Sequence, residues 1–157
     1  MIVKSQIENR RSKIAIVGAG PAGSSLAIRL AMAGFPVTLI ERERFPRHKL
    51  CGEFISPECL RHFRDIGVFD EMIGAGGRRI AETRFYSMNG RNAAVPSGWL
   101  GNGELALSLS RAEMDSALLK RALGCGVDVR DGTTVTAIEK DGSRVTGLSI
   151  RDANGAV

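Results

Sequence analysis

Six residues, Gly18-Ala19-Gly20-Pro21-Ala22-Gly23, constrain the fold most, because they follow a short apolar run and open a helical pattern. The run, residues 13–17, is typical of a strand buried on both faces of a parallel sheet. Residues 22–33 are small or aliphatic and precede Gly34, which predicts a helix ending there. Residues 37–40 are apolar and largely β-branched, so they predict a second strand. This order of strand, turn, helix and strand predicts a βαβ unit.

The glycine spacing in this unit matches Gly-x-Gly-x-x-Gly and predicts a dinucleotide site. The first glycine allows a tight turn, the second lets backbone N–H groups approach a diphosphate, and the third lets the helix pack on the strand. Glu41 ends the second strand and can accept hydrogen bonds from an adenosine ribose. The predicted cofactor-binding residues are Gly18, Ala19, Gly20, Pro21, Ala22, Gly23 and Glu41. The Glu41 carboxylate would repel a 2′-phosphorylated nucleotide, and the glycine motif leaves both FAD and NAD open.

The remaining sequence predicts helices and antiparallel strands. Asn89-Gly90 and Asp141-Gly142 are dipeptides typical of tight hairpin turns. The predicted elements are a loop over 42–53, a helix from Ser56-Pro57 to Gly67, strands at 83–86 and 91–95, a strand containing Leu105, Leu107 and Leu109, a helix from Ser110 to Gly124, strands at 127–129, 134–139 and 145–150, and a reversal at Asn154-Gly155.

Composition restricts the class of protein. A chain of 157 residues with 43% hydrophobic and 25% charged residues has the balance of one globular domain. The net charge of +5 mildly favours anionic ligands, whereas aromatic residues at 5% provide no stacking platform for nucleic acid, so we expect no nucleic-acid partner. There is no apolar stretch long enough to span a membrane, and residues 1–13 lack a signal-peptide core, which predicts a cytoplasmic location. We expect the three cysteines, Cys51, Cys59 and Cys125, to be reduced thiols, and we expect no metal site.

Two further segments resemble a known family. Phe45-Pro46-Arg47-His48-Lys49-Leu50-Cys51-Gly52-Glu53, followed by Phe54-Ile55-Ser56-Pro57, is similar to the loop after the second strand in FAD-dependent monooxygenases and reductases of the p-hydroxybenzoate hydroxylase type. Within that group it most resembles the geranylgeranyl reductase branch, and flavin-dependent halogenases are more distant cousins. Leu109-Ser110-Arg111-Ala112-Glu113-Met114-Asp115 resembles the family's arginine-containing helix start.

The resemblance implies an α/β fold, a Rossmann-like, three-layered FAD-binding domain with an inserted β-hairpin. It implies FAD in an extended pose, with Arg111 reaching the cofactor, Cys51, Gly52 and Glu53 near the isoalloxazine ring, and a backbone contact from Val135 to adenine. It also implies NAD(P)H as electron donor and a small organic or isoprenoid substrate, to be hydroxylated or reduced. Independently of the family, Arg42 and Arg47 follow the predicted diphosphate site, where cations would offset phosphate charge.

The sequence also predicts an incomplete enzyme. Relatives carry two further cofactor signatures, which have no clear counterpart here, and a Trp-x-Trp-x-Ile-Pro halogenase signature is absent from the sequence. We therefore expect the N-terminal portion of a longer flavoenzyme, which needs a C-terminal portion or a second chain, with residues 77–109 in a partial substrate-side β region. The alternative is a non-catalytic module that binds the ADP half of a dinucleotide. We expect His48 and His62 at the surface, and Trp99 either in a substrate cleft or, more commonly for a lone tryptophan, as packed apolar bulk.

Overall fold

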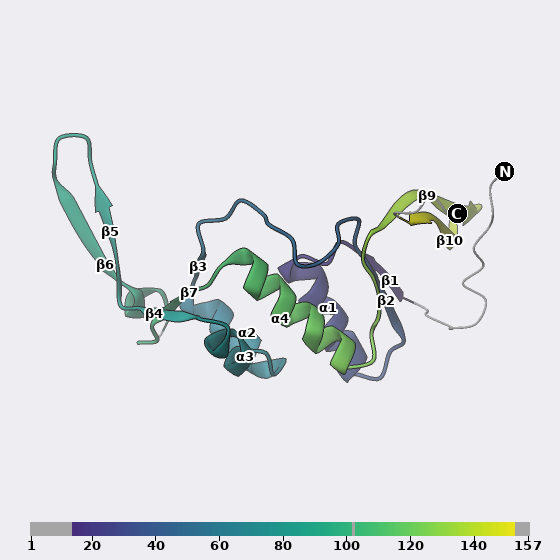
Figure 1. Cartoon of the computed structure of the whole chain (residues 1–157), viewed down its shortest axis with the longest axis horizontal. Coiled ribbons are helices and arrows are strands. Elements are labelled where there is room, and N and C mark those ends of the chain that lie inside the picture. Colours follow the sequence, from purple (N-terminus) through teal and green to yellow (C-terminus); the bar gives the residue numbers. More distant parts are fainter. Residues whose placement is uncertain (1–13, 102, 153–157) are drawn as a thin grey trace. The chain divides into compact units, whose positions relative to one another are not determined.

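The chain consists of two compact units (Figure 1). The computed structural model describes residues 14–101 and 103–152. The first unit takes the chain up to Arg47 and again from Leu118 onward, and the second unit is His48–Ala117. Helix α4, Arg111–Gly124, therefore contributes residues to both units.

The first unit contains the predicted βαβ arrangement. Strands β1 (Ile14–Val17), β2 (Val37–Ile40) and β8 (Asp128–Arg130) form a parallel sheet in the order β1-β2-β8. Helix α1 (Pro21–Met32) connects the first two strands. Every residue of β2 is buried, as the continuous apolar run predicts for a central parallel strand. The predictions of β1, α1 and β2 are confirmed.

A hairpin completes the first unit. Strands β9 (Thr133–Asp141) and β10 (Arg144–Asp152) pair antiparallel, and Gly142 between them has a φ of 57°, which confirms the Asp141-Gly142 turn. The chain reversal predicted at Asn154-Gly155 lies outside the described residues. Residues 1–13, in which we expect no signal peptide, lie outside them as well.

The second unit has a three-stranded antiparallel sheet in the order β3-β7-β4. Apolar residues of its strands and helices form the core, including Leu60, Phe63, Met72 and Leu107, all buried. Its elements are β3 (Phe54–Ile55), α2 (Pro57–Asp65), α3 (Phe69–Gly74), β4 (Arg78–Ile80), β5 (Glu82–Tyr86), β6 (Asn92–Pro96), the 3₁₀ helix η1 (Ser97–Leu100), β7 (Ala106–Ser108) and the start of α4. The prediction missed β3, α3 and β4, because elements of two to six residues are too short to show a periodic pattern.

The hairpin predicted around Asn89-Gly90 is confirmed as β5 and β6. Gly90 has a φ of 82°, and the Asn89 side chain accepts a hydrogen bond from the backbone N–H of Arg91 at 3.2 Å. The positive φ of Gly90 and the hydrogen bond of Asn89 explain why this dipeptide turns the chain here. Within the described residues, no helix is long and apolar enough to cross a membrane; α4, with 14 residues, is the longest of them.

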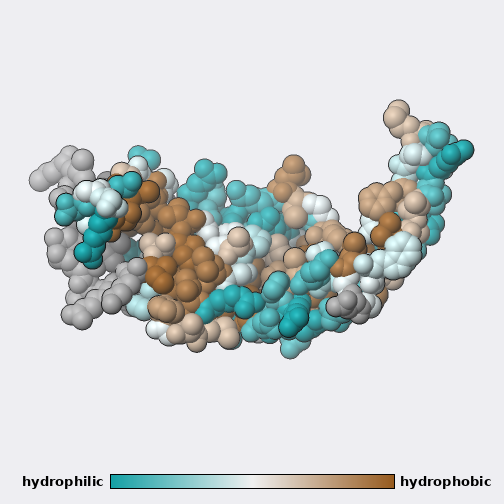
Figure 2. Space-filling model, turned by 180° about the vertical axis from the view of Figure 1, so that it is seen from behind, coloured by the Kyte–Doolittle hydropathy of each residue, from teal (hydrophilic) through white to brown (hydrophobic). Residues whose placement is uncertain are grey.

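The first unit exposes apolar side chains at its sheet edge. Strand β1 lies at one edge of the sheet, and there Val17 is 61% exposed, whereas Ile16, which points the other way, is buried. Figure 2 shows apolar residues gathered on the visible face of this unit. On α1, the side chains of Leu26 and Met32 are also exposed. An unpaired apolar edge strand is a template for association with other chains.

We expect Val17→Lys to raise the concentration at which the chain remains monomeric, because a charge on an edge strand opposes pairing with another edge. The free energy of unfolding should change by no more than about 0.5 kcal/mol, since this side chain is mostly exposed. Light scattering over a concentration series, together with urea unfolding, would measure both. Ile16→Lys is the matched control: burying a charge there should destabilise the unit, and equal effects of the two variants would contradict the prediction.

Candidate functional site

The turn between β1 and α1 contains three glycines, and the structural environment differs from one to the next. Gly18 has a φ of 103°, which favours glycine, and its N–H donates to the Ile40 carbonyl at 2.7 Å. A Cβ atom on Gly23 would overlap the carbonyl oxygen of Gly18. The backbone of Gly20 is extended, with φ −76° and ψ −178°, a conformation open to any residue. Backbone conformation therefore explains the first glycine and crowding against Gly18 the third, whereas the backbone angles of Gly20 do not themselves require glycine.

The N-terminus of α1 suits an anion. Gly20 is the N-cap and makes no side-chain cap hydrogen bond, Pro21 occupies the first turn, and that turn holds no acidic residue. Backbone N–H groups at a helix N-terminus carry partial positive charge and favour phosphate oxygens. A Cβ built on Gly18 would meet no atom within 4 Å, so the space beside the turn is open. These features fit a diphosphate.

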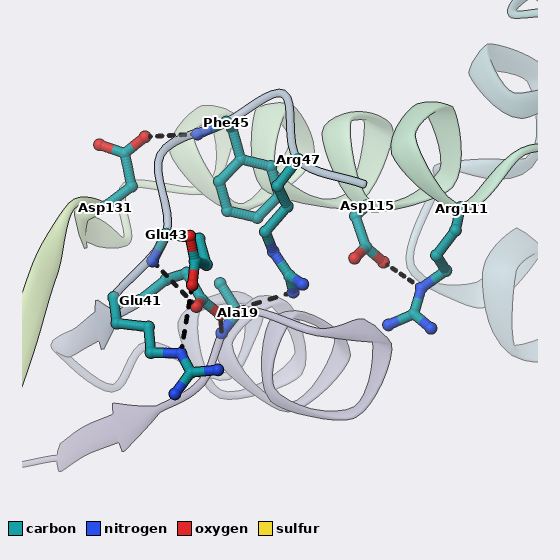
Figure 3. Close-up of polar contacts among 9 residues, drawn as sticks. Ala19, Glu41, Glu43, Phe45, Arg47, Arg111, Asp115 and Asp131 are labelled. Carbon is teal, nitrogen blue, oxygen red and sulfur yellow. Dashed lines mark hydrogen bonds and ion pairs between the residues drawn. The ribbon is translucent and has the colours of Figure 1, made fainter. Parts of the chain in front are cut away.

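The Glu41 carboxylate lies against this turn (Figure 3). Its Oε2 accepts the N–H of Ala19 at 2.9 Å and lies 3.5 Å from Nη2 of Arg47, while its Oε1 accepts the N–H of Glu43 at 3.2 Å. The residue is only 7% exposed. With two neighbours on Oε2 and one on Oε1, it is Oε1 that keeps room to accept a ligand hydroxyl.

Arg47 and Arg42 differ in burial, although their sequence positions predict the same role for both. The Arg47 side chain is 6% exposed, and its guanidinium lies 5.1 Å from the Phe45 ring centroid and faces Glu41. The Arg42 side chain is 67% exposed and pairs loosely with Glu43 at 3.4 Å. Arg47 is thus built into the site, whereas Arg42 is a surface cation beside it.

Asp131 holds the loop that carries these residues, and the sequence analysis missed this role. Its Oδ2 accepts the N–H of Phe45 at 3.1 Å, and the N–H of Gly132 donates to the carbonyl of Glu43 at 3.3 Å (Figure 3). Asp131-Gly132 is the turn between β8 and β9, and it also holds the loop after β2. The signal available was an Asp-Gly turn in which the aspartate side chain can bind backbone N–H groups.

The start of β9 adjoins the same site. The N–H of Thr133 donates to the carbonyl of Glu41 at 2.9 Å, and the N–H of Glu41 donates to the carbonyl of Arg130. Val135 follows two residues later, half-buried and paired with Ile150. The first unit therefore brings together the glycine turn, Glu41, Arg47 and the beginning of β9.

In the second unit, Cys51, Gly52 and Glu53 lie in an exposed loop before β3. Glu53 has a φ of 53°, a left-handed conformation that is uncommon for a residue other than glycine. Its carbonyl accepts the N–H of Leu109 at 3.3 Å, so this loop is tied to the segment that enters α4. Cys51, Cys59 and Cys125 are free thiols.

Arg111 opens α4 in the same unit. The Ser110 hydroxyl accepts the N–H of Glu113 at 3.2 Å, which confirms Ser110 as the helix cap. Nε of Arg111 donates to Oδ1 of Asp115 at 2.8 Å (Figure 3). This bond to Asp115 raises the pKa of Arg111; burial lowers that pKa, and the nearby Cys51 thiol raises it further. The guanidinium is therefore a fixed cation that does not titrate.

Three other predicted residues lie elsewhere. His48 and His62 are exposed, as predicted. The expectation that Trp99 packs as apolar bulk is wrong: it is 77% exposed. It lies in the short helix η1 directly after the β5–β6 hairpin, where too few neighbouring side chains cover it.

Several known proteins are similar to this chain in sequence and in fold. The family described as FAD binding domain matches residues 11–156. A menaquinone reductase of Mycolicibacterium smegmatis is 32% identical over 93% of this chain and 35% of its own length. A flavoprotein/dehydrogenase structure from Cytophaga hutchinsonii superposes with a TM-score of 0.80 at 30% identity, covering 90% of this chain and 35% of that one. A myxobacterial chondrochloren halogenase gives a TM-score of 0.79 at 32% identity, covering 90% and 33%. The chain thus spans about a third of the length of each of these three relatives.

Proposed function

The chain belongs to the FAD binding domain family, and from this premise we propose that it holds FAD within a flavin-dependent oxidoreductase. When bound, FAD supplies the redox chemistry, and the protein positions and shields it. The observation that carries the proposal is Gly20, a glycine whose extended backbone does not require glycine, placed at an uncapped helix N-terminus. A ligand that needs close approach to that backbone explains its missing side chain.

The first unit would hold the adenosine diphosphate half of FAD. In the proposed arrangement the diphosphate lies on the residues of the turn and the first turn of α1, and Oε1 of Glu41 accepts a ribose hydroxyl. Arg47 keeps the Glu41 carboxylate in place and adds positive charge near the phosphates. The N–H of Ala19 is engaged by Glu41, so Ala19 would act by orienting that carboxylate.

The other predicted residues are proposed as cofactor contacts on the family resemblance. They are Cys51, Gly52, Glu53, Arg111 and the backbone of Val135. Arg42 is proposed independently of the family, because a cation after the glycine turn would offset phosphate charge. Two geometric observations support this set. Arg111 is anchored and charged, and the Glu53 backbone has an uncommon conformation of the kind that clusters at binding sites.

For the whole protein we propose a reductase, with electrons supplied by NAD(P)H and an apolar organic or isoprenoid substrate. The support is the resemblance of residues 45–57 to the geranylgeranyl reductase branch and the 32% identity with a menaquinone reductase. The second candidate function is hydroxylation or halogenation of an organic substrate. The similarity to the structure of an FAD-dependent halogenase favours it. NADPH consumption that depends on an added quinone, without dependence on oxygen, would support the reductase.

Gly20→Val tests the FAD proposal. We expect FAD binding to fall at least about a hundredfold, because the valine side chain would occupy the approach of the diphosphate. The fold should persist, since valine adopts the extended backbone found at this position. Titration of FAD, followed by quenching of flavin fluorescence, measures affinity, and circular dichroism measures folding.

The matched control is Gly52→Val, in an exposed loop where a Cβ meets no atom within 4 Å. Because Gly52 is proposed near the flavin ring, the control is read with ADP, which lacks that ring. ADP binding should be lost in Gly20→Val and kept in Gly52→Val. Equal ADP affinity for all three proteins would show that the glycine turn binds no diphosphate.

A further inference from the structure

We propose that Asp115 is a positioning residue that fixes the guanidinium of Arg111 so that its two terminal nitrogens face an anionic or carbonyl oxygen of bound FAD. The proposal rests on the proposed FAD function and deepens it. It assigns a role to a residue that would contact neither the cofactor nor a substrate.

The contact between the two side chains is direct. Nε of Arg111 donates to Oδ1 of Asp115 at 2.8 Å, and the two residues lie one helical turn apart on α4. Asp115 is completely buried, whereas the Arg111 side chain is 20% exposed. The carboxylate therefore acts as a fixed internal anchor, and the guanidinium reaches from it toward the surface of the unit.

Helix stability does not account for this pair. A cation in the first turn of a helix opposes the helix dipole, and acidic residues are favoured there instead. Burying a carboxylate also carries a desolvation cost, which a buried ion pair seldom recovers in full relative to apolar side chains of similar size. The neighbouring core positions Met114 and Leu118 show that this part of α4 buries apolar side chains readily. An arginine and a buried aspartate at these positions thus indicate a role in binding.

Asp115 does not engage the terminal nitrogens of Arg111, and the guanidinium has the Cys51 thiol as a further neighbour. Asp115 engages Nε, and Figure 3 shows the two terminal nitrogens of Arg111 pointing away from α4. Those nitrogens form a planar fork that binds phosphate or carboxylate oxygens in pairs. An arginine side chain loses rotational freedom when it is held in one direction, and an anchor that holds it beforehand lowers that cost on binding.

The test is a double-mutant cycle on FAD affinity, measured by flavin fluorescence on the full chain. The variants are Asp115→Asn, Asp115→Leu, Arg111→Gln and each Asp115 change combined with Arg111→Gln. We expect Asp115→Leu to weaken FAD binding about tenfold and Asp115→Asn, which keeps one acceptor oxygen but no charge, to weaken it less; neither change should have a further effect when Arg111 is already glutamine. Asp115→Asn keeps the size of the side chain, so it provides a test of the pair even if the leucine variant fails to fold.

The matched control is Glu104→Gln. It breaks an Arg–carboxylate pair in the same unit, in which Nη1 of Arg64 lies 2.8 Å from Oε1 of Glu104, and it should leave FAD affinity unchanged. A second readout needs no ligand: the Arg111 Nε–H resonance should be shifted and protected from exchange in the wild type, and lose both properties in Asp115→Leu, where no acceptor remains.

The outcomes separate the inference from the proposed function. Wild-type protein that binds neither FAD nor ADP would overturn the proposed function, and the inference with it. Wild-type binding that is unchanged in both Asp115 variants, or lost equally with and without Arg111, would overturn the inference alone. Loss of ADP affinity that depends on Arg111 would support it and place the contact at the diphosphate, whereas loss for FAD alone would support it and place the contact in the flavin half.

Discussion

Gly23→Val is expected to destabilise the first unit by about 3 kcal/mol or more, because its Cβ would overlap the carbonyl oxygen of Gly18. The Gly18 oxygen is a backbone atom, so no flexible side chain can move aside to relieve the overlap. The helix would have to shift away from the sheet, and the packing of the buried residues Ala27 and Ile28 would be lost with it. FAD affinity should disappear together with folding.

Urea unfolding followed by circular dichroism measures this loss. Gly124→Ala is the matched control, because this glycine ends α4 and a Cβ there meets no atom within 4 Å. That variant should be neutral or slightly stabilising, since alanine is a better helix former. A Gly23→Val protein as stable as Gly124→Ala would mean that α1 does not approach the strand closely.

Glu41→Ala is expected to affect both folding and binding. Removing the carboxylate takes away the negative charge that faces the buried Arg47 and the acceptor of the Ala19 N–H. Breaking a buried ion pair from one side costs about 3 kcal/mol of unfolding free energy. FAD binding should weaken by about 1 to 3 kcal/mol in addition, the usual cost of losing a hydrogen bond to a charged group.

Glu41→Gln separates the two effects, because glutamine retains the shape and one acceptor oxygen while removing the charge. Unfolding by urea and titration with FAD should both show a smaller loss than for alanine. If Glu41→Ala unfolds at the wild-type urea concentration, the contacts of this carboxylate with Ala19 and Arg47 do not stabilise the unit. If it binds FAD with wild-type affinity, Glu41 does not contact the ribose.

The sequence predicted the βαβ unit well because its signals are local. The glycine spacing, the apolar run of β2 and the stop at Gly34 each act within a few residues. The two hairpins followed from Asn89-Gly90 and Asp141-Gly142 for the same reason. The arrangement of β3, β7 and β4 was missed, because a sheet of such short strands depends on contacts between distant segments.

The sequence named candidate site residues one by one, but it did not predict the interactions among them. Sequence position could not distinguish buried Arg47 from exposed Arg42, since burial depends on how the loop folds back over β2. The contact between Asp131 and Phe45 joins residues 86 positions apart. The pair of Arg111 and Asp115 was missed as well, although an aspartate four residues after an arginine on a helix is a recognisable pattern.

The anchoring of the loop after β2 determines when its conformational entropy is lost. Glu43 and Phe45 donate their N–H groups to Glu41 and Asp131, and Arg47 faces Glu41, so the contacts that hold this loop come from the protein itself. The ordering cost of this loop is therefore met during folding, and the adenosine end of FAD would meet a rigid surface.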